Sequence, residues 1–274
     1  MSEGAIYWSP HLDDAALSCG GLIRRQVTDG TPVLVVTVFA GEPQHAELSA
    51  YAIGTHRKWG AATNLTAERK EEDRRAMGIL GARYLHLAYT DAIYRLSDGS
   101  FLYSSDQELF GPLHPAEAEL VSSLAAMVDG LPTSREVTMY APLAVGNHVD
   151  HQLVRDSVLN LPNQCSQVVF YEDYPYSDTP GALTQALTTL GTHDWESELE
   201  SLDERCVKAK IAAIAAYQSQ MATLFEGEEA MALRVREYSR AMSPDEGFAE
   251  RYWRTSLRHK RGQSQRRLEQ GTVV

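Results

Sequence analysis

The sequence predicts an α/β fold: a Rossmann-like, mainly parallel sheet with helices on both faces, forming a single domain with long loops around the active-site edge. Apolar, β-branched runs such as PVLVVTVF at 32–39 are typical of parallel strands that are buried on both faces. Strand-like and helix-like segments alternate from the first residues onward. No internal repeat or linker divides the 274 residues, which are enough for one large domain with a real core.

The elements can be placed along the chain from periodicity and turn signals. Strands are expected at 5–9, 32–39, 83–87, 136–140 and 167–171. Helices are expected at 15–28, at 51–59, from an N-cap at Thr66 to Leu80, at 115–128, from near Asn147, and as one long amphipathic helix at 203–225. Ligands of such sheets bind outside the carboxyl ends of the strands, so the residues that follow each strand are the candidates for chemistry.

Composition limits the partners of this protein. Hydrophobic residues make up 43% and the formal net charge is -12. Residues 251–274 contain seven arginines and lysines against one glutamate, a charge of +6, so the remainder carries -18. An acidic body argues against a nucleic-acid or anionic-membrane partner. We expect a domain at 1–250 and a basic, flexible tail at 251–274.

No segment resembles a secretion signal or a membrane span, so the expected location is the cytoplasm. The oligomeric state has no signal in the sequence.

A histidine and two adjacent carboxylates follow the first expected strand, as His11, Asp13 and Asp14 in PHLDD. Adjacent carboxylates repel each other unless a cation or a hydrogen-bond donor compensates. Imidazole combined with carboxylate suits Zn²⁺, and also Fe²⁺ or Co²⁺, better than magnesium or calcium. Taken alone, this segment has a structural alternative, in which an aspartate caps the following helix and His11 is a turn residue.

Two further histidines follow the strand expected to end at Tyr140. With Asn147 as N-cap, His148 and His151 would lie three residues apart on one face of the first helical turn. The carboxyl ends of parallel strands open at one edge of the sheet, so we expect these histidines to meet the PHLDD motif. The two motifs together predict a metal centre.

A catalytic zinc takes three protein ligands and keeps one position open. His11, one aspartate of the pair and one of the two later histidines would supply them. The remaining carboxylate can act as general base, and the remaining histidine can stabilise an oxyanion or protonate a leaving amine. This set is typical of a metal amidase, but spacing does not assign the individual roles. A helix N-terminus disfavours protonated His148, so a carboxylate must offset it, with Asp150 nearby.

The motifs PHLDD at 10–14 and HVDH at 148–151 resemble the LmbE/PIG-L family of zinc-dependent N-acetylglucosaminyl deacetylases. The resemblance covers roughly residues 5–175. It implies that His11, Asp14 and His151 bind zinc, that Asp13 is the general base and that His148 assists the oxyanion and the leaving group. It also implies hydrolysis of the N-acetyl or N-acyl amide of an amino-sugar conjugate, with an N-acetylated sugar or glycoconjugate as the small-molecule partner.

Several weaker signals concern substrate binding. The resemblance continues in RKEE at 69–72 and at Asp91, and implies that Arg69 and Asp91 contact the sugar. For Arg69, an ion pair with Asp73 at i+4 is the alternative. Tyr94 and Arg95 in the aromatic segment 88–115, and Glu172 after a strand end, are further expected contacts.

The chain departs from the family pattern at two positions. Leu12 stands where proline is commoner, which should leave the ligands unchanged. Some members have a tyrosine at the position of Gly146, so help from a tyrosine must come from elsewhere, with Tyr94, Tyr174 and Tyr176 as candidates.

Other functions lack their signatures. Cys19-Gly20-Gly21 comes too late and lacks the GxGxxG pattern of a dinucleotide-dependent oxidoreductase, and the GxSxG of a serine hydrolase is absent. Two alternatives remain. One is a metal-dependent amidase or esterase that acts on a non-sugar N-acyl substrate, and the other is a non-catalytic, metal-containing sugar-binding module.

Overall fold

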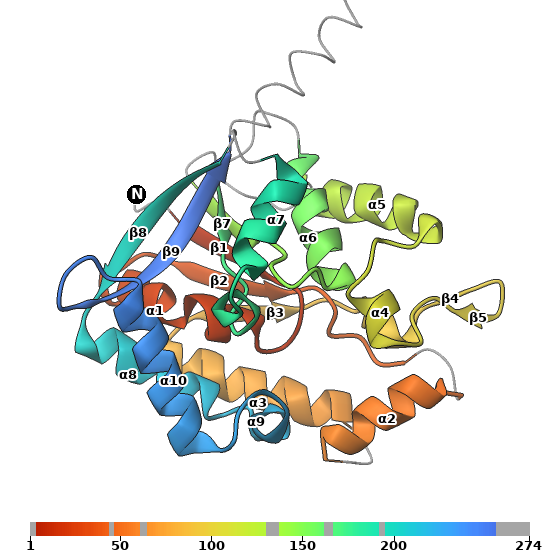
Figure 1. The fold of residues 1–274 in the computed structure, drawn as a ribbon, viewed down its shortest axis with the longest axis horizontal. Coiled ribbons are helices and arrows are strands. Elements are labelled where there is room, and N and C mark those ends of the chain that lie inside the picture. Colours follow the sequence, from red (N-terminus) through yellow and green to blue (C-terminus); the bar gives the residue numbers. More distant parts are fainter. Residues whose placement is uncertain are drawn as a thin grey trace, which may run out of the picture.

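The computed structural model describes residues 4–43, 47–60, 65–129, 137–161, 167–191 and 195–255. Its centre is a seven-stranded sheet in the order β3-β2-β1-β6-β7-β9-β8 (Figure 1). Five strands run parallel: β1 (Gly4–Ser9), β2 (Val33–Thr37), β3 (Arg83–His86), β6 (Val137–Pro142) and β7 (Val168–Tyr171). The antiparallel strands β9 (Phe248–Thr255) and β8 (Trp195–Leu202) extend the sheet beyond β7. The predicted fold class is confirmed.

Helices cover both faces of the sheet (Figure 1). One layer contains α1 (Asp14–Thr28), α3 (Leu65–Leu80), α8 (Glu204–Ile214) and α10 (Glu228–Ala241), and the other contains α5 (Ala118–Asp129), α6 (Val149–Leu159) and α7 (Ala182–Leu190). Strand β1 serves both layers because successive side chains of a strand point to opposite faces. Tyr7 joins the core under α1, whereas Ile6 and Trp8 join the core under α6.

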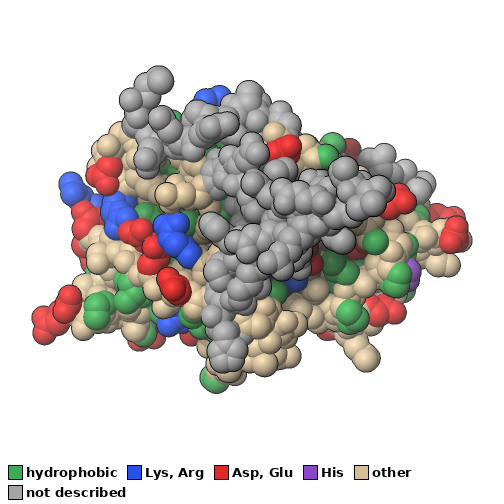
Figure 2. Space-filling model, turned by 90° about the horizontal axis from the view of Figure 1, so that it is seen from above, with side chains coloured by type: hydrophobic (Ala, Val, Ile, Leu, Met, Phe, Trp, Pro, Cys, Tyr) green, Lys and Arg blue, Asp and Glu red, His purple; other side chains and the backbone are tan. Residues whose placement is uncertain are grey.

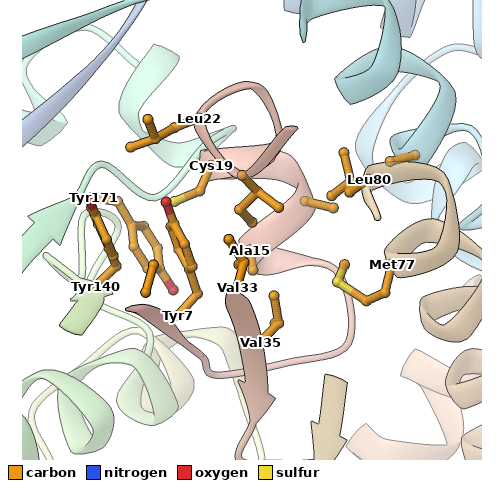
Figure 3. Close-up of a cluster of buried hydrophobic side chains, with 14 of the residues drawn as sticks. Tyr7, Ala15, Cys19, Leu22, Val33, Val35, Met77, Leu80, Tyr140 and Tyr171 are labelled. Carbon is orange, nitrogen blue, oxygen red and sulfur yellow. The ribbon is translucent and has the colours of Figure 1, made fainter. Parts of the chain in front are cut away.

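Figure 3 shows the core that holds α1 against the sheet. The rings of Tyr7 and Tyr140 stack with their centroids 4.3 Å apart. Ala15, Cys19 and Leu22 of α1 are all buried in this cluster at helical spacing. The amino end of α1, which carries the PHLDD carboxylates, is thereby fixed on the rigid part of the sheet.

The remaining described elements are short and lie mostly around one edge of the sheet. They are α2 (Ala50–Lys58), the 3₁₀ turn η1 (Ala92–Tyr94), the hairpin β4 (Leu96–Ser97) and β5 (Ser100–Phe101), α4 (Asp106–Leu109), the 3₁₀ turns η2 (Pro115–Glu117) and η3 (Tyr176–Asp178), and α9 (Gln218–Leu224). No helix among the described residues is long and apolar enough to span a membrane.

The predicted single helix at 203–225 is wrong, because the chain forms α8 and then α9. The carboxylate of Glu72 on α3 accepts hydrogen bonds from the backbone N–H and the hydroxyl of Ser219, at 2.8 and 2.6 Å. The ring of Tyr217 turns inward, where its hydroxyl donates to Asp73 at 2.7 Å. These contacts with α3 replace a continuous helical path. Thr66 is likewise not an N-cap, since α3 already begins at Leu65.

The expected boundary at residue 250 falls inside strand β9, which continues to Thr255. Glu250 ties this strand to α1, because its carboxylate accepts the backbone N–H groups of Gly21 and Leu22 at 3.0 and 2.9 Å. Lys210 of α8 joins the same contact, because its Nζ donates to Glu250 Oε1 at 2.7 Å. Residues 256–274 of the expected tail lie outside the described residues.

Strands β8 and β9 were not predicted, although Glu196, Glu198 and Glu200 alternate with uncharged residues along β8 at the period of a strand. Acidic and basic side chains are intermixed at the left of Figure 2, the side on which these two strands lie in Figure 1. The pair Arg254–Glu198, with N and O atoms 2.8 Å apart, joins the two strands. Cross-strand opposite charges of this kind add a modest stabilisation.

Strand β1 lies between β2 and β6, so the chain builds the sheet first to one side of β1 and then to the other. The carboxyl ends of β1 and β6 are therefore neighbours at the point where the strand order reverses. Both predicted motifs follow these two strand ends.

Candidate metal centre

The turn from β1 into α1 is shaped by Ser9. Its hydroxyl donates to the carbonyl of His11 at 2.7 Å and accepts the backbone N–H of Ala15 at 3.1 Å. Asp14 Oδ2 accepts the backbone N–H of His11 at 2.8 Å. Asp13 occupies the N-cap position of α1, but its side chain makes no capping hydrogen bond. The purely structural explanation of the aspartate pair therefore leaves the Asp13 carboxylate unexplained.

The turn from β6 into α6 differs from the expected one. Asn147 is not the N-cap: its backbone is left-handed, with φ 65°, and its side-chain amide donates to the carbonyls of Phe110 and Gly111 at 2.9 and 3.0 Å. Asparagine tolerates this conformation better than most residues. His148 is the N-cap instead, and its Nδ1 accepts the backbone N–H of Asp150 at 3.2 Å. Its Nε2 is thus left to carry the ring proton.

One nitrogen of His11 and one nitrogen of His151 lie close to the carboxylate of Asp14. Its Oδ2 lies 3.2 Å from His11 Nδ1 and 3.3 Å from His151 Nε2. Donor atoms bound tetrahedrally to one zinc ion at about 2.0–2.1 Å are separated by about 3.3–3.4 Å. The two distances to Asp14 Oδ2 are therefore compatible with a metal ion shared by these residues.

His11, His148 and His151 also place one nitrogen each within 4.8 Å of one another. We favour the set with Asp14 over this triple, because Asp14 lies between His11 and His151 and brings the negative charge that a divalent cation needs. His148 has already committed Nδ1 to the backbone.

Each of the two histidines has its second ring nitrogen on a buried carboxylate. His11 Nε2 lies 2.9 Å from Asp150 Oδ2, and His151 Nδ1 lies 2.6 Å from Asp173 Oδ1. Metal-binding histidines almost always donate their other N–H to such a partner, which fixes the tautomer and raises the basicity of the ligand. Asp150 and Asp173 are thus candidate functional residues; the sequence reasoning left the orientation of Asp150 open and missed Asp173. Asp173 follows the end of a predicted strand, and this position was the sequence signal that could have identified it.

Arg95 does not contact the cavity, contrary to expectation. Its guanidinium is buried, donates to Asp150 Oδ1 at 2.5 Å and forms an ion pair with Glu117. Tyr103 donates to the same glutamate at 2.5 Å. In this structure Arg95 therefore pairs with the carboxylate that contacts His11 Nε2, behind the histidine as seen from the cavity.

Burial and charge shift the pKa values in this cluster. Burial raises the pKa of Asp13 to about 6, opposed by Arg69, whose Nη2 lies 3.6 Å from Asp13 Oδ1. Burial also acts to raise the pKa of Asp14, but the charges of His151 and His11 outweigh it and hold that pKa well below its usual range. The pKa of His148 is well below its usual value because of burial and the neighbouring His11. The two aspartates thus differ strongly in pKa, and burial disfavours the charged form of His148.

An open cavity of about 840 Å³, counted to its mouth, lies over these residues. Its floor contains His11, Asp13, Asp14 and His148. Its walls come from α2, α4, η3 and α9, with the rings of Tyr51, Trp59, Phe110 and Tyr176 among them. A polar floor within partly aromatic walls is suited to a sugar that carries a larger group.

Of the five expected substrate contacts, Arg69 and Asp91 line this cavity. Arg69 lies under the ring of Trp59, 4.8 Å from its centroid, and its Nε is buried without a hydrogen-bond partner. The alternative ion pair with Asp73 is not formed, because Asp73 is bound by His86 and Tyr217. The guanidinium of Arg69 is paired with Asp13 through Nη2, and its partnerless Nε leaves hydrogen-bonding capacity beside the cavity.

Tyr94 and Glu172 are not among the cavity-lining residues. The hydroxyl of Tyr94 lies 2.5 Å from His56 Nε2. Glu172 is held by Arg251 and by the indole N–H of Trp253, the latter at 2.8 Å. Tyr94 lines a smaller neighbouring pocket that shares Trp59, Arg69 and Asp91 with the cavity, so its contact with a substrate stays a prediction. Glu172 lines neither space.

Tyr176 fills the space at Gly146. A Cβ at Gly146 would lie 2.7 Å from the Tyr176 ring, and the glycine backbone has φ 87°. The ring also lies edge-on to His151, with centroids 6.0 Å apart. Of the three tyrosines considered from the sequence, Tyr176 alone lines the cavity.

Comparison with known proteins agrees with this geometry. Residues 6–161 match the model of the PIG-L family, described as GlcNAc-PI de-N-acetylase. A 2'-N-acetylparomamine deacetylase of Niallia circulans is 29% identical over 238 residues, which is 82% of this chain and 83% of that protein. A 2'-N-acetylparomamine deacetylase of Streptomyces fradiae is 33% identical over 179 residues, 62% of this chain and 56% of that protein.

Solved structures show the same relationship. The zinc-inhibited form of a teicoplanin deacetylase is 28% identical with a TM-score of 0.75, over 91% of this chain and 96% of that one. The A40926 pseudoaglycone deacetylase is 25% identical with a TM-score of 0.68, over 92% of this chain and 97% of that one. The family match spans more than half of the chain and contains both motifs. The chain belongs to the PIG-L family and is a metal-dependent N-deacetylase.

Proposed function

We propose that this protein hydrolyses the N-acetyl amide of an amino-sugar conjugate to the free amine and acetate, with zinc held by His11, Asp14 and His151. The observation that carries the assignment is the meeting of three donor atoms at 3.2 and 3.3 Å, with a carboxylate behind each histidine. Zinc in this position would polarise the amide carbonyl and acidify the attacking water.

Asp13 is the general base in this proposal. Its carboxylate lines the cavity, makes no capping hydrogen bond and is next in sequence to the ligand Asp14. Arg69 holds it from the side, at 3.6 Å. A carboxylate in this place can accept the proton of the attacking water and later deliver it toward the leaving amine.

His148 acts as a neutral hydrogen-bond donor to the oxyanion. Because Nδ1 accepts the backbone N–H of Asp150, the ring proton lies on Nε2, and the ring lines the cavity. A neutral ring needs no carboxylate partner, and Asp150 contacts His11 Nε2 instead. A preorganised donor of this kind stabilises developing charge without reorganisation during the reaction.

The substrate class follows from the cavity and the relatives. The named relatives are deacetylases of 2'-N-acetylparomamine, of teicoplanin and of the A40926 pseudoaglycone, which supports an N-acetylated conjugate as the substrate. Here Arg69 and Asp91 offer polar contacts to a sugar near the floor, and the open mouth between α2, α4 and α9 leaves room for the attached group.

The test is a panel of N-acetylated amino sugars, aminoglycoside precursors, glycopeptides and non-sugar amides, assayed by mass for the loss of acetyl. Asp13→Asn should abolish turnover while zinc content stays near that of the wild type. Asp98→Asn, at an exposed turn position between β4 and β5, is the matched control and should keep full activity. Loss of zinc in Asp13→Asn would make Asp13 a ligand instead.

Two outcomes would favour the alternatives. Turnover confined to the non-sugar amides would indicate an amidase of another class. Tight zinc and sugar binding without turnover of any amide would indicate a sugar-binding module.

A further inference from the structure

A small apolar pocket adjoins the general base. It is lined by Asp13 together with Leu17 of α1, Ile214 of α8, and Met221 and Leu224 of α9. Asp13, Leu17, Gln220 and Leu224 also line the large cavity, so the two spaces are neighbours beside Asp13. Apart from Asp13 and two other polar residues, its lining is apolar, and it exposes no polar surface. None of His11, Asp14, His148 or His151 borders it.

The chemistry of amide hydrolysis gives this pocket an occupant, on the basis of the proposed function. The carbonyl carbon under attack has three substituents: the oxygen, the nitrogen and the acyl carbon. The oxygen would face His148 and the residues that would hold the metal, and the nitrogen would lead to the sugar in the large polar cavity. Asp13 must reach the attacking water, so the acyl carbon lies within about one water diameter of its carboxylate. An apolar group at that place is most stable in an apolar pocket.

We propose that this pocket receives the acyl group of the substrate and that Met221 and Leu224 set its length. The free space inside is close to that of a single water molecule, which is also the size of a methyl group. An acetyl methyl fits without rearrangement, whereas each additional methylene must displace a wall residue. The wall belongs to the packed cluster of Leu17, Ile214, Met221 and Phe225, which resists such displacement.

The pocket is closed by a part of the chain outside the family match. The match ends at residue 161, whereas Ile214, Met221 and Leu224 come from α8 and α9. Short helix α9 is held in place by Glu72 through Ser219. The acyl-length limit is therefore a property of the C-terminal helices, and is separable from the motifs that hold the metal.

The test compares formyl, acetyl, propionyl and butyryl amides of the one amino sugar that the wild type deacetylates fastest. Because every member carries the same sugar, ratios of kcat/KM within this series cancel any effect of a substitution on sugar binding. Met221 borders the small pocket and not the large cavity, so Met221→Ala is the sharpest variant. A buried methylene contributes about fourfold, so butyryl should gain roughly 15-fold relative to acetyl in Met221→Ala. Met221→Phe should shift the ratio toward formyl.

Leu224→Ala provides a second enlargement should the first variant not fold, and thermal unfolding of each variant monitors this. Leu233→Ala, at an exposed position of α10, is the control and should leave all ratios unchanged. Unchanged ratios in folded Met221→Ala and Leu224→Ala would overturn the pocket while hydrolysis of the acetyl member still supports the proposed function. Absence of hydrolysis across the whole panel would overturn the proposed function and the pocket with it.

Discussion

Replacement of Asp173 by asparagine tests whether the carboxylate behind His151 orders the metal site. Both oxygens of Asp173 are used: Oδ1 faces His151 Nδ1 at 2.6 Å and Oδ2 accepts the backbone N–H of Val145 at 2.8 Å. Asparagine has the same shape but only one acceptor. If its oxygen stays with Val145, its amide opposes the ring N–H, and the proton must move to Nε2, the nitrogen that faces Asp14.

The expected decrease in zinc affinity follows from the loss of the hydrogen bond between Asp173 and His151. A hydrogen bond to a charged group contributes about 1.5–3 kcal/mol. Loss of such a partner of a metal-binding histidine typically lowers metal affinity about 10–100-fold. We therefore expect Asp173→Asn to weaken zinc binding by about one to two orders of magnitude.

The assay is competition for zinc between the metal-free protein and a fluorescent chelator, with thermal unfolding of the metal-free proteins measured in parallel. Asp178→Asn is the matched control, because Asp178 lies on the same segment but forms an exposed ion pair with Arg234 at 2.9 Å. It should leave zinc affinity unchanged. Wild-type zinc affinity in folded Asp173→Asn would refute the reasoning, and a lower unfolding temperature alone would reduce Asp173 to a packing residue.

Three further predictions concern stability and the metal. Lys210→Met leaves buried Glu250 without its cationic partner at 2.7 Å, so urea titration should show a loss of about 3–5 kcal/mol, partly restored by adding Glu250→Gln; an unchanged midpoint contradicts this. Gly146→Ala forces a Cβ against the Tyr176 ring and should cost about 1–3 kcal/mol in thermal unfolding. Gly54→Ala in α2 meets no atom within 4 Å, so it should be neutral or slightly stabilising, and equal effects of the two would exclude the steric cause. Removal of metal with a chelator should abolish deacetylation and Zn²⁺, Fe²⁺ or Co²⁺ should restore it, whereas activity in the stripped protein would exclude a metal mechanism.

The central strands, helix α1 and the placement of both motifs could be predicted from the sequence because their signals are local. Apolar, β-branched runs identify β1 and β2, and the motifs follow strand ends that parallel topology brings to one edge. Convergence of His11 with the later histidines follows from this topology alone.

The partners of those residues were decided by tertiary structure. His11 meets Asp150, which lies 139 residues away, although Asp150 stands beside His148 in the sequence. Arg95 is drawn inward by two buried carboxylates, and a buried guanidinium is stable only with such partners. No spacing rule reveals this, because it depends on which charges the fold places together.

In the C-terminal third of the chain, too, tertiary contacts decided features that the sequence did not reveal. Helical periodicity predicts one helix at 203–225, but Glu72, 147 residues away, takes the N–H of Ser219 and the chain starts a second helix. The strands β8 and β9 carry charges on their exposed faces, so their pairing emerges only in the assembled sheet. Sequence by itself determined the five parallel strands, the two motifs and the chemistry of their side chains. Tertiary structure decided the orientation of the histidines and the shape of the cavity, because both depend on contacts between residues far apart in the chain.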